Sequence, residues 1–550
     1  MNDPGTERSD VSGEGFSLRT TRADEDAFTA TLEALVSDGV AAGIAAKDPT
    51  LWGAEAEAEA AQRLAWVSLP QTSRPLVDEV ALLGVELRQR GVFNVVLCGM
   101  GGSSLAPEVI CGAAGVPLTV LDSSDPDFVR AALEDRLAET VVVVSSKSGG
   151  TVETDSQRRA FEKAFTDADI DPADRIVVVT DPGSPLEASA REAGYRVFLA
   201  DPEVGGRYSA LTAFGLVPSG LAGADISMLL DSAERIRPDL EQDSVDNPAL
   251  RLGALLGTAN HAGVDKLVLV DAGSSYPGLG DWVEQLVAES TGKDGKGILP
   301  VVVPGTDVPD VAPSRPDEVL ATFGPDDLLG SHPPVSGWGV CLDGDLGGQL
   351  LLWEYATAVA GRVLGINPFD QPDVESAKVA SRELLDGGGA TPEPVFTDGP
   401  VTVYATDGLL PDGTATVADA VAALLGHVDE GHGYLAVQAY LDRHRDAALA
   451  GARDALAART GRPVTFGWGP RFLHSTGQYH KGGPATGVYL QVTGDPEADL
   501  AVPDRPFTFQ EFLTAQAVGD AQVLADRGRP VLRLHVAGPT HLDVVRAALA

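Results

Sequence analysis

At 550 residues the chain is longer than a single hydrophobic core can serve, and its length predicts roughly three or four domain-sized units. Its 80 acidic and 40 basic residues give a formal net charge of −40, which disfavours nucleic acids and anionic membranes as partners. Any site for an anion must therefore be built locally, from backbone N–H groups and a few placed cations.

The N-terminus and the cysteines indicate a compartment. The opening stretch, MNDPGTERSDVSGEGF, is polar and acidic, unlike a signal or transit peptide, and no run of about 18 apolar residues occurs. Cys98, Cys111 and Cys341 lack CxxC spacing, so we interpret them as small buried side chains in a reducing environment. We expect a cytoplasmic protein with no membrane or nucleic-acid partner, and no cofactor or metal.

The first part of the chain predicts a helical segment followed by an α/β unit. Residues 27–64 are rich in alanine and glutamate with helical periodicity, broken by KDPTLWG. Short apolar runs then alternate with helix-length segments, a pattern typical of a parallel sheet. The predicted strands lie at 94–100, 118–124, 140–146, 175–181 and 195–201.

A second series of apolar runs begins after Asp246 and predicts another α/β unit. Its expected strands lie at 266–273, 297–303 and 339–345. The segments 303–338 and 386–400 are rich in proline, glycine and aspartate, and we interpret both as surface loops or a linker. The fold class is therefore α/β, with two doubly wound units in tandem.

Two loops at predicted strand ends have the composition of an anion site. GMGGSSLAPEV (99–109) and SKSGGTVET (146–154) each place glycines and hydroxyl groups before a helix, and the second adds Lys147. Each loop alone is as well explained by a tight turn. Because ligands of such sheets bind at the carboxyl ends of neighbouring strands, the two together favour one phosphate site. Neither loop matches a P-loop or a GxGxxG fingerprint.

Two further segments carry candidate catalytic residues. Arg207 follows two glycines in EVGGRYSAL, at another strand end, although most arginines serve only in surface ion pairs. Gln285 and Glu289 are four residues apart in DWVEQLVAESTGK and share one helical face. Glu289 is either an ordinary solvated charge or, lodged in an apolar cleft, a general base.

Five motifs in one order resemble the phosphoglucose isomerase family over roughly residues 90–380. They read GMGGSSLAP, SKSGGTVET, GGRYSALTAFGL, QLVAESTGK and INPFDQPDVESAK. The resemblance implies a pair of sugar isomerase (SIS-like) domains, a helical segment before them and a C-terminal extension. We place the boundaries at 1–75, 76–240, 241–500 and 501–550.

The resemblance also implies roles for single residues. Glu289 would move the proton between C2 and C1, Arg207 would stabilise the enediolate, and Lys378 would assist ring opening. Where the family has FT or TT, this chain has Gly149 and Gly150, so the second loop loses side-chain donors. The implied phosphate and substrate ligands are Gly102, Ser103, Ser146, Lys147, Ser148, Thr151 and Gln285.

The ring-opening histidine is less directly assigned. The family carries it in a QHxFYQxxHQG helix, which LHSTGQYHKGG (473–483) resembles with one residue deleted and at a later place in the chain. We favour His474 as the catalytic histidine and assign His480 to substrate binding. Either residue could instead be an ordinary buried or capping histidine.

The implied activity is metal-independent interconversion of glucose 6-phosphate and fructose 6-phosphate through a cis-enediol. A phosphoglucose/phosphomannose isomerase of dual specificity and a non-catalytic sugar-phosphate sensor are the alternatives. AAKDPTLWG and GPRFLHSTGQYHKGG look like the isomerase half of bacterial transaldolase–isomerase fusions, but too little sequence precedes Asn94 for a transaldolase barrel. The family resemblance also implies a homodimer.

Overall fold

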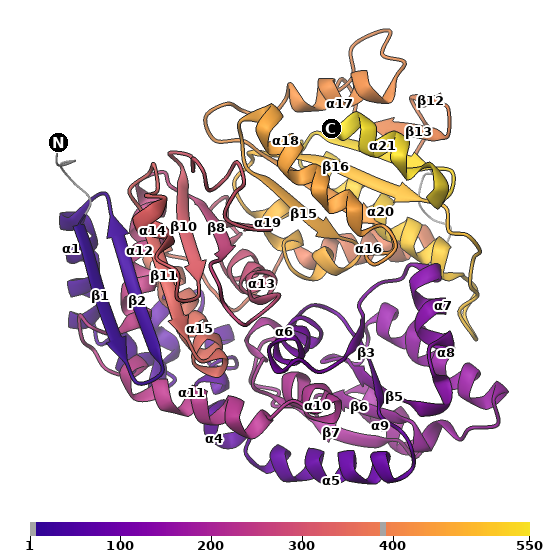
Figure 1. The fold of residues 1–550 in the computed structure, drawn as a ribbon, viewed down its shortest axis with the longest axis horizontal. Coiled ribbons are helices and arrows are strands. Elements are labelled where there is room, and N and C mark those ends of the chain that lie inside the picture. The colour runs from indigo at the N-terminus through magenta and orange to yellow at the C-terminus, as the bar shows by residue number, and fades with distance from the viewer. Residues whose placement is uncertain (1–6, 386–391) are drawn as a thin grey trace.

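Three separate β-sheets organise the chain in the computed structural model, which describes residues 7–385 and 392–550. In Figure 1 the first sheet lies at lower right, the second at left and the third at upper right. Helices flank each sheet, and most strand pairs are parallel. The predicted mixed α/β class is therefore confirmed.

The first sheet is entirely parallel, with strand order β4-β3-β5-β6-β7. Its central strands are continuous apolar runs that are buried on both faces, as the sequence indicates. All five strands predicted for this region are present. They are β3 (Asn94–Gly99), β4 (Thr119–Leu121), β5 (Thr140–Ser145), β6 (Ile176–Thr180) and β7 (Arg196–Leu199). The accompanying helices are α5 (Pro75–Gln89), α6 (Leu105–Ala114), α7 (Pro126–Glu134), α8 (Val152–Asp167), α9 (Pro185–Glu192) and α10 (Ala213–Ala222).

The second sheet has the order β1-β2-β11-β10-β8-β9, in which the N-terminal hairpin β1–β2 pairs antiparallel onto β11. The N-terminal segment, which we expected to be helical, thus also supplies two strands. Segment 303–338, interpreted as a loop, contains β10, a fully buried strand between β8 and β11. Its proline-rich flanks and its charged first residue, Glu318, hide a strand that reads EVLATF, with only a short apolar stretch. The strands are β1 (Glu7–Gly13), β2 (Phe16–Arg22), β8 (Lys266–Asp271), β9 (Leu299–Val303), β10 (Glu318–Phe323) and β11 (Gly339–Gly344).

Helices of the second unit enclose a core in which two of them approach closely. A Cβ atom added to Gly253 on α12 would lie 2.5 Å from Cγ1 of Val359 on α15, and Gly257 meets Val363 in the same way. Among the described residues, no helix combines the length and apolar character needed to cross a bilayer. The helices are α1 (Glu25–Ser37), α2 (Val40–Ala45), α3 (Glu57–Ala60), α4 (Leu69–Thr72), α11 (Ile226–Leu240), α12 (Pro248–His261), α13 (Leu279–Thr291), α14 (Leu328–Ser331), α15 (Leu346–Leu364) and α16 (Val374–Leu385).

The third sheet, with order β12-β13-β17-β16-β14-β15, draws its strands from both sides of residue 500. Residues 501–550, which we expected to form an extension, therefore complete a sheet that begins before them; β17 lies between β13 and β16. The strands are β12 (Phe396–Asp398), β13 (Val401–Ala405), β14 (Tyr434–Tyr440), β15 (Val464–Trp468), β16 (Gly487–Gly494) and β17 (Val531–Val536). The helices are α17 (Val417–Leu425), α18 (Ala452–Thr460), α19 (Gly477–Gly482), α20 (Phe509–Asp526) and α21 (Leu542–Leu549).

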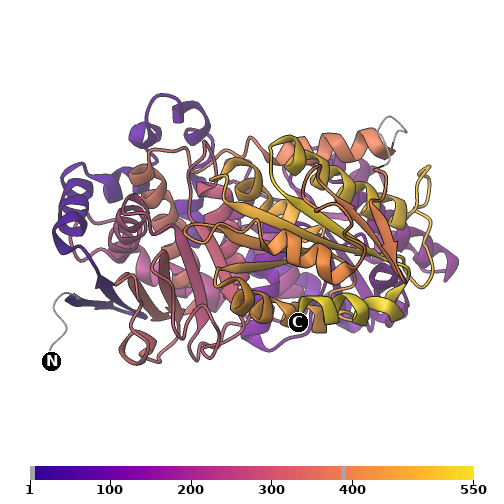
Figure 2. The same ribbon diagram turned by 90° about the horizontal axis from the view of Figure 1, so that it is seen from above.

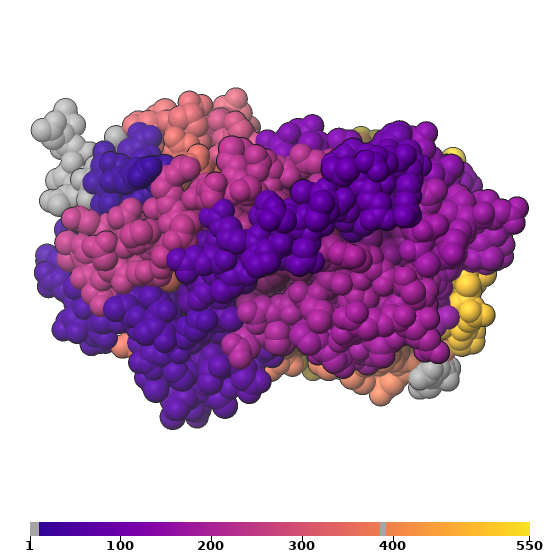
Figure 3. Space-filling model, turned by 90° about the horizontal axis from the view of Figure 1, so that it is seen from below, coloured from indigo at the N-terminus to yellow at the C-terminus, as the bar shows by residue number. Residues whose placement is uncertain are grey.

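The three units pack into one body. Seen from above, the yellow and orange C-terminal unit lies against the pink second unit (Figure 2). One hydrophobic cluster joins them, with Val268 and Leu299 of the second sheet and Tyr434 and Tyr489 of the third. From below, the indigo N-terminal residues run across the magenta middle of the chain (Figure 3).

We predict that Gly253→Ala lowers the free energy of unfolding by about 1–3 kcal/mol, because the added methyl group overpacks the contact between α12 and α15. Thermal and urea unfolding of the wild type and of Gly253→Ala would measure the change in the free energy of unfolding. Gly451→Ala is the matched control, since an added Cβ there meets nothing within 4 Å. Equal stability of the two variants would contradict the packing argument.

Candidate active site

The two glycine- and hydroxyl-rich loops lie side by side at the carboxyl edge of the first sheet. Strands β3 and β5 pair directly, with Gly99 opposite Ser145, so the loops that follow them are neighbours. In the second loop the hydroxyl of Ser146 donates to Oγ1 of Thr151 over 3.0 Å. The arrangement is the one expected for a shared anion site.

The glycine pair in the second loop has a structural reason. Gly149 has φ +69°, and a Cβ there would lie 2.8 Å from Cβ of Leu186. The loop thus packs on the start of α9 in a conformation that favours glycine. The hydroxyl or aromatic side chain that the family has here would not fit this path.

Lys147 does not present a free cation in this structure. Its Nζ lies 2.5 Å from Oδ2 of Asp181, at the end of β6, and 3.4 Å from the carbonyl oxygen of Pro202. Burial raises the pKa of Asp181, although the charge of Lys147 opposes that rise. A phosphate bound by Lys147 would have to compete with this carboxylate.

Two glycines of the first loop bring three separate loops together. A Cβ on Gly102 would lie 1.9 Å from the carbonyl oxygen of Gly206, in the 3₁₀ helix η6 (Gly206–Tyr208). Gly101, with φ +56°, approaches the carbonyl oxygen of His474 in η8 (Arg471–His474) to within 2.8 Å of its would-be Cβ. Ser103 is buried in the same turn. The loops that carry Arg207 and His474 are therefore in contact with the first phosphate loop.

Arg207 is buried, and neutral groups hold its guanidinium. Nε donates to Ser290 Oγ over 2.8 Å and Nη1 to Gln371 Oε1 over 2.8 Å. Nη2 donates to the carbonyl oxygens of Pro368 and Asp370 over 2.7 and 3.0 Å. Because these four acceptors are uncharged, they fix the position of the guanidinium without themselves neutralising its charge.

Glu289 lies beside this cation on α13. Its Oε1 is 3.4 Å from Nη1 of Arg207, and its Oε2 accepts from Nε2 of Gln285 over 3.1 Å. Gln285 Nε2 also donates to the carbonyl oxygen of His474 over 2.7 Å. Gln285 and Glu289 share one helical face, as their spacing predicts, and Gln285 links Glu289 to the η8 loop.

His474 and Lys378 line one cavity of about 320 Å³, whose walls come from the second phosphate loop with the start of α8, from α16, from the η8 loop and from α20. Nε2 of His474 lies 3.0 Å from Oε1 of Glu153, in the first turn of α8. Lys378 on α16 is half exposed, and its Nζ lies 3.6 Å from Oε2 of Glu375. Ser148 and Thr151 of the second phosphate loop line the same cavity.

Glu153 is a site residue that our sequence analysis did not single out. It is buried, and Gln516 on α20 donates a second hydrogen bond to its Oε1 over 2.7 Å. Burial alone would raise the pKa of Glu153, but the hydrogen bond and charge of His474, with the charge of Lys378, hold it below its ordinary value. Its position within the motif SKSGGTVET could have identified it, but only the lysine and the hydroxyl groups of that motif were considered as ligands.

His480 lies apart from this cavity, in the core of the third unit. Its ring packs against Tyr434 and Tyr489, and Nδ1 lies 3.3 Å from Nε2 of Gln438. Nε2 has no hydrogen-bond partner among the described residues. The structure thus brings His474 to the site together with Glu153, and places His480 in the ordinary buried setting that we had kept as the alternative.

Comparison with known protein sequences identifies similar proteins. A family model described as "Phosphoglucose isomerase" matches residues 84–297, a range that contains both phosphate loops, Arg207 and Glu289. A "Probable glucose-6-phosphate isomerase" of Haloarcula marismortui is 31% identical over 352 residues, which cover 56% of this chain and 80% of that protein. The "Glucose-6-phosphate isomerase" of Rubrobacter xylanophilus is 30% identical, covering 57% and 87%.

Two solved structures are similar to this chain over most of its length. A hypothetical protein from Thermus thermophilus is 25% identical with a TM-score of 0.57, covering 67% of this chain and 99% of that one. A glucose-6-phosphate isomerase from Chlamydia trachomatis, 20% identical with a TM-score of 0.55, covers 70% and 91% and shares the fold.

His480 makes a testable contribution to acid stability. Burial, with the charges of Lys481 and Arg529, lowers its pKa from 6.5 to about 3. Below pH 6.5 the imidazole of His480 is therefore protonated in the unfolded chain but stays neutral in the folded chain. Its contribution to the free energy of unfolding is fully present above pH 6.5 and falls as the pH drops toward 3. The slope is at most about 1.4 kcal/mol per pH unit. We expect His480→Gln to flatten this acid dependence, measured by unfolding at several pH values.

The exposed His541 supplies the control, because His541→Gln should leave the wild-type slope unchanged. An unchanged slope in His480→Gln would show that other groups carry the acid sensitivity.

Proposed function

This chain belongs to the phosphoglucose isomerase family, and we infer that it is a glucose-6-phosphate isomerase. It interconverts glucose 6-phosphate and fructose 6-phosphate, an aldose–ketose isomerisation of glycolysis. The observation that carries the assignment of roles is the contact between the Glu289 carboxylate and the buried Arg207 guanidinium. A base and a fixed cation at this distance suit proton abstraction beside a carbonyl group.

We propose that Glu289 moves the proton. Its carboxylate removes the C2 proton of the open-chain aldose, and the C1 carbonyl oxygen takes up the electron pair as an enediolate. The proton on O2 then passes to O1, the C2 carbonyl forms, and the same carboxyl group returns its proton to C1. The hydrogen bond from Gln285 leaves Oε1 of Glu289 on the side of Arg207. Arg207 stabilises the developing negative charge, and its hydrogen bonds mean that it needs little reorganisation.

The sugar phosphate binds between the two loops of the first sheet in this proposal. Backbone N–H groups near Gly102 and the hydroxyl groups of Ser146, Ser148 and Thr151 supply donors, since Gly149 and Gly150 offer no side chains. Lys147 adds charge by exchanging Asp181 for phosphate. The binding energy of this remote group holds C1 and C2 against Glu289.

Ring opening is assigned to His474 with Lys378 nearby. A hydrogen bond from Nε2 to the ionised Glu153 would fix the tautomer and leave Nδ1 to accept a proton. Glu153 would then stabilise the imidazolium that forms. Lys378, on the wall of the same cavity, is the complementary acid or base. His480 takes no step in this proposal.

Three finer points accompany the proposal. The motifs AAKDPTLWG and GPRFLHSTGQYHKGG support kinship with the isomerase half of transaldolase–isomerase fusions. Family resemblance supports a homodimer. Three buried, unpaired cysteines, Cys98, Cys111 and Cys341, suit a reducing compartment such as the cytoplasm.

We predict that Glu289→Gln abolishes incorporation of deuterium at C2 of glucose 6-phosphate when fructose 6-phosphate is offered in deuterated water with EDTA. The amide cannot accept the proton, so the rate should fall at least about 1,000-fold while sugar-phosphate binding persists. Mass spectrometry of the product and calorimetric titration would measure the two effects. Unimpaired exchange would refute the role of Glu289, and a wild-type protein without turnover would indicate a sugar-phosphate sensor.

We predict that Glu153→Gln slows turnover of the cyclic substrate about 100-fold by removing the charge behind His474. Proton exchange on erythrose 4-phosphate, whose chain is too short to close a ring through its phosphorylated end, should change less than fivefold. Gln516→Ala is the control, because it removes the other hydrogen bond to Glu153 and leaves the contact with His474. Equal losses on both substrates would contradict a role in ring opening.

A further inference from the structure

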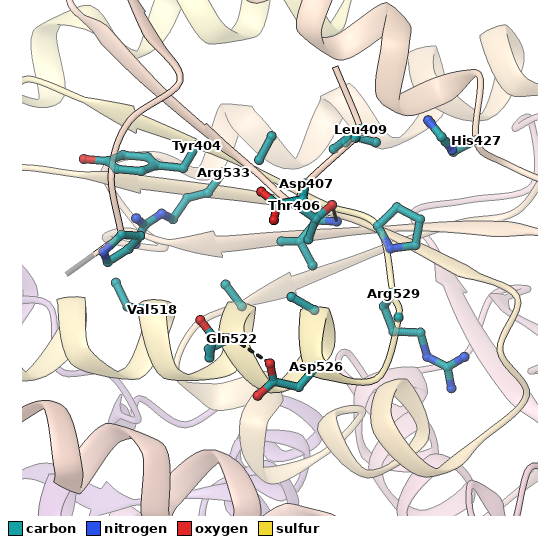
Figure 4. Close-up of a pocket in the computed structure, with 18 residues that line it drawn as sticks. Tyr404, Thr406, Asp407, Leu409, His427, Val518, Gln522, Asp526, Arg529 and Arg533 are labelled. Atoms are coloured by element: carbon teal, nitrogen blue, oxygen red, sulfur yellow. Dashed lines mark hydrogen bonds between the residues drawn. The ribbon is translucent and has the colours of Figure 1, made fainter. Parts of the chain in front are cut away.

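A cavity of about 540 Å³ lies in the third unit, between the β13–β17 side of the sheet and helix α20 (Figure 4). It shares no lining residue with the cavity that holds His474. Its walls include apolar side chains such as Leu409 and Val518, and Figure 4 shows Arg533 and Tyr404 together at one end.

Arg533 is the unusual group in this cavity. The residue is 7% exposed, and its guanidinium makes no hydrogen bond or ion pair with any residue in the described ranges. Its Cζ lies 4.1 Å from the centre of the Tyr404 ring, opposite it on β13. Burial lowers the pKa of Arg533, and the nearby Tyr404 and Tyr440 oppose that shift without reversing it.

The neighbouring carboxylates are engaged elsewhere. Asp520 on α20 binds Lys481 over 2.6 Å and accepts from Gln491 over 3.2 Å. Asp526 accepts from Gln522 over 2.7 Å, along the same helix (Figure 4). The cation at this end of the cavity is therefore left without a charged partner in the described structure.

All three guanidinium nitrogens of Arg533 remain accessible from the cavity, where they can donate hydrogen bonds to a ligand. The side chains on the opposite face of β17, Leu532 and Leu534, are apolar core residues, so the strand itself has no need of charge. The alternation places Arg533 on the face toward α20. An anion that enters the cavity gains charge-assisted hydrogen bonds from this guanidinium.

We propose that this cavity binds a small oxyanion-bearing metabolite, whose phosphate or carboxylate group pairs with Arg533. Thr406, Asp407 and Gln522 line the middle of the cavity and offer partners for hydroxyl groups on the rest of the ligand. The volume suits a molecule of metabolite size. This site lies beyond the isomerase reaction, but α20 connects the two, because Gln516 on that helix binds Glu153.

The test is calorimetric titration of the whole chain with inorganic phosphate and, in a separate arm, with citrate. The two arms distinguish a phosphate from a carboxylate ligand. The variants are Arg533→Met, which keeps an apolar stem over Tyr404, and Ala521→Leu, which fills the cavity without touching the guanidinium. Arg546→Met removes an exposed arginine as the control, and Lys147→Ala removes the cation of the active-site loop.

For at least one anion, we expect the wild type to show a binding step that Lys147→Ala and Arg546→Met retain. Arg533→Met and Ala521→Leu should each weaken that binding step at least tenfold. Without added phosphate or citrate, kcat of each variant should stay within twofold of the wild-type value. Without added phosphate or citrate, Arg533→Met should melt at the wild-type temperature or above it, because Arg533 makes no hydrogen bond or ion pair with the described residues that the substitution could remove. Absence of the step with both anions, its persistence in Arg533→Met, or a lower melting temperature of that variant would each overturn the proposal.

Discussion

The close approach of Gly102 to Gly206 is the constraint on which the site depends. With a would-be Cβ only 1.9 Å from the carbonyl oxygen of Gly206, no other residue fits at 102 without separating the loops. The neighbouring Gly101 meets the backbone of His474 in the same turn. One glycine pair at the end of β3 thus sets the distance from the phosphate loops to both Arg207 and His474. Besides leaving room for an anion, these glycines allow the loop after β3, the loop of Arg207 and the loop of His474 to pack together.

Positive charges are scarce in a protein with a net charge of −40, and the site holds its buried arginine mainly through uncharged acceptors. Arg207 is held by a serine, an amide and two carbonyl oxygens, with its carboxylate neighbour Glu289 no closer than 3.4 Å. The neighbouring Lys293 shows how burial and a nearby positive charge disfavour a second cation. Its Nζ bonds to backbone oxygens and to Asp370, and burial, with the charge of Arg207, lowers its pKa to about 8. Two cations are thus fixed close together, where an enediolate would relieve their repulsion.

The sequence predicts those parts of the fold in which each element shows its own pattern. Strands buried on both faces, such as β3 and β5, read as apolar runs, and the helix bearing Glu289 shows its periodicity. Strand β10 escaped prediction because prolines surround a short run, and the sheet completed by β17 escaped because strand order is set by packing, not by local pattern.

Site residues divide in the same way. Motif residues such as Lys378 and His474 could be placed from the chain alone, because their neighbours in sequence identify them. The partners that define their chemistry could not. Glu153 contacts His474 from 321 residues away in sequence, and Asp181, which pairs with Lys147, follows another strand. A contact between side chains from distant segments leaves no trace in the local pattern of either.

The third unit is a working part of the site, since it supplies both His474 and Gln516. The amide of Gln285 donates to the backbone of His474 and to Glu289 at once. The orientation of Glu289, the proposed base in the second unit, therefore depends on how the third unit docks. The matched family segment, 84–297, contains Glu289 but not the backbone oxygen that helps to fix it. The proposed active site accordingly includes the sheet that begins at β12, and helix α20, which carries Gln516, connects that sheet to Glu153.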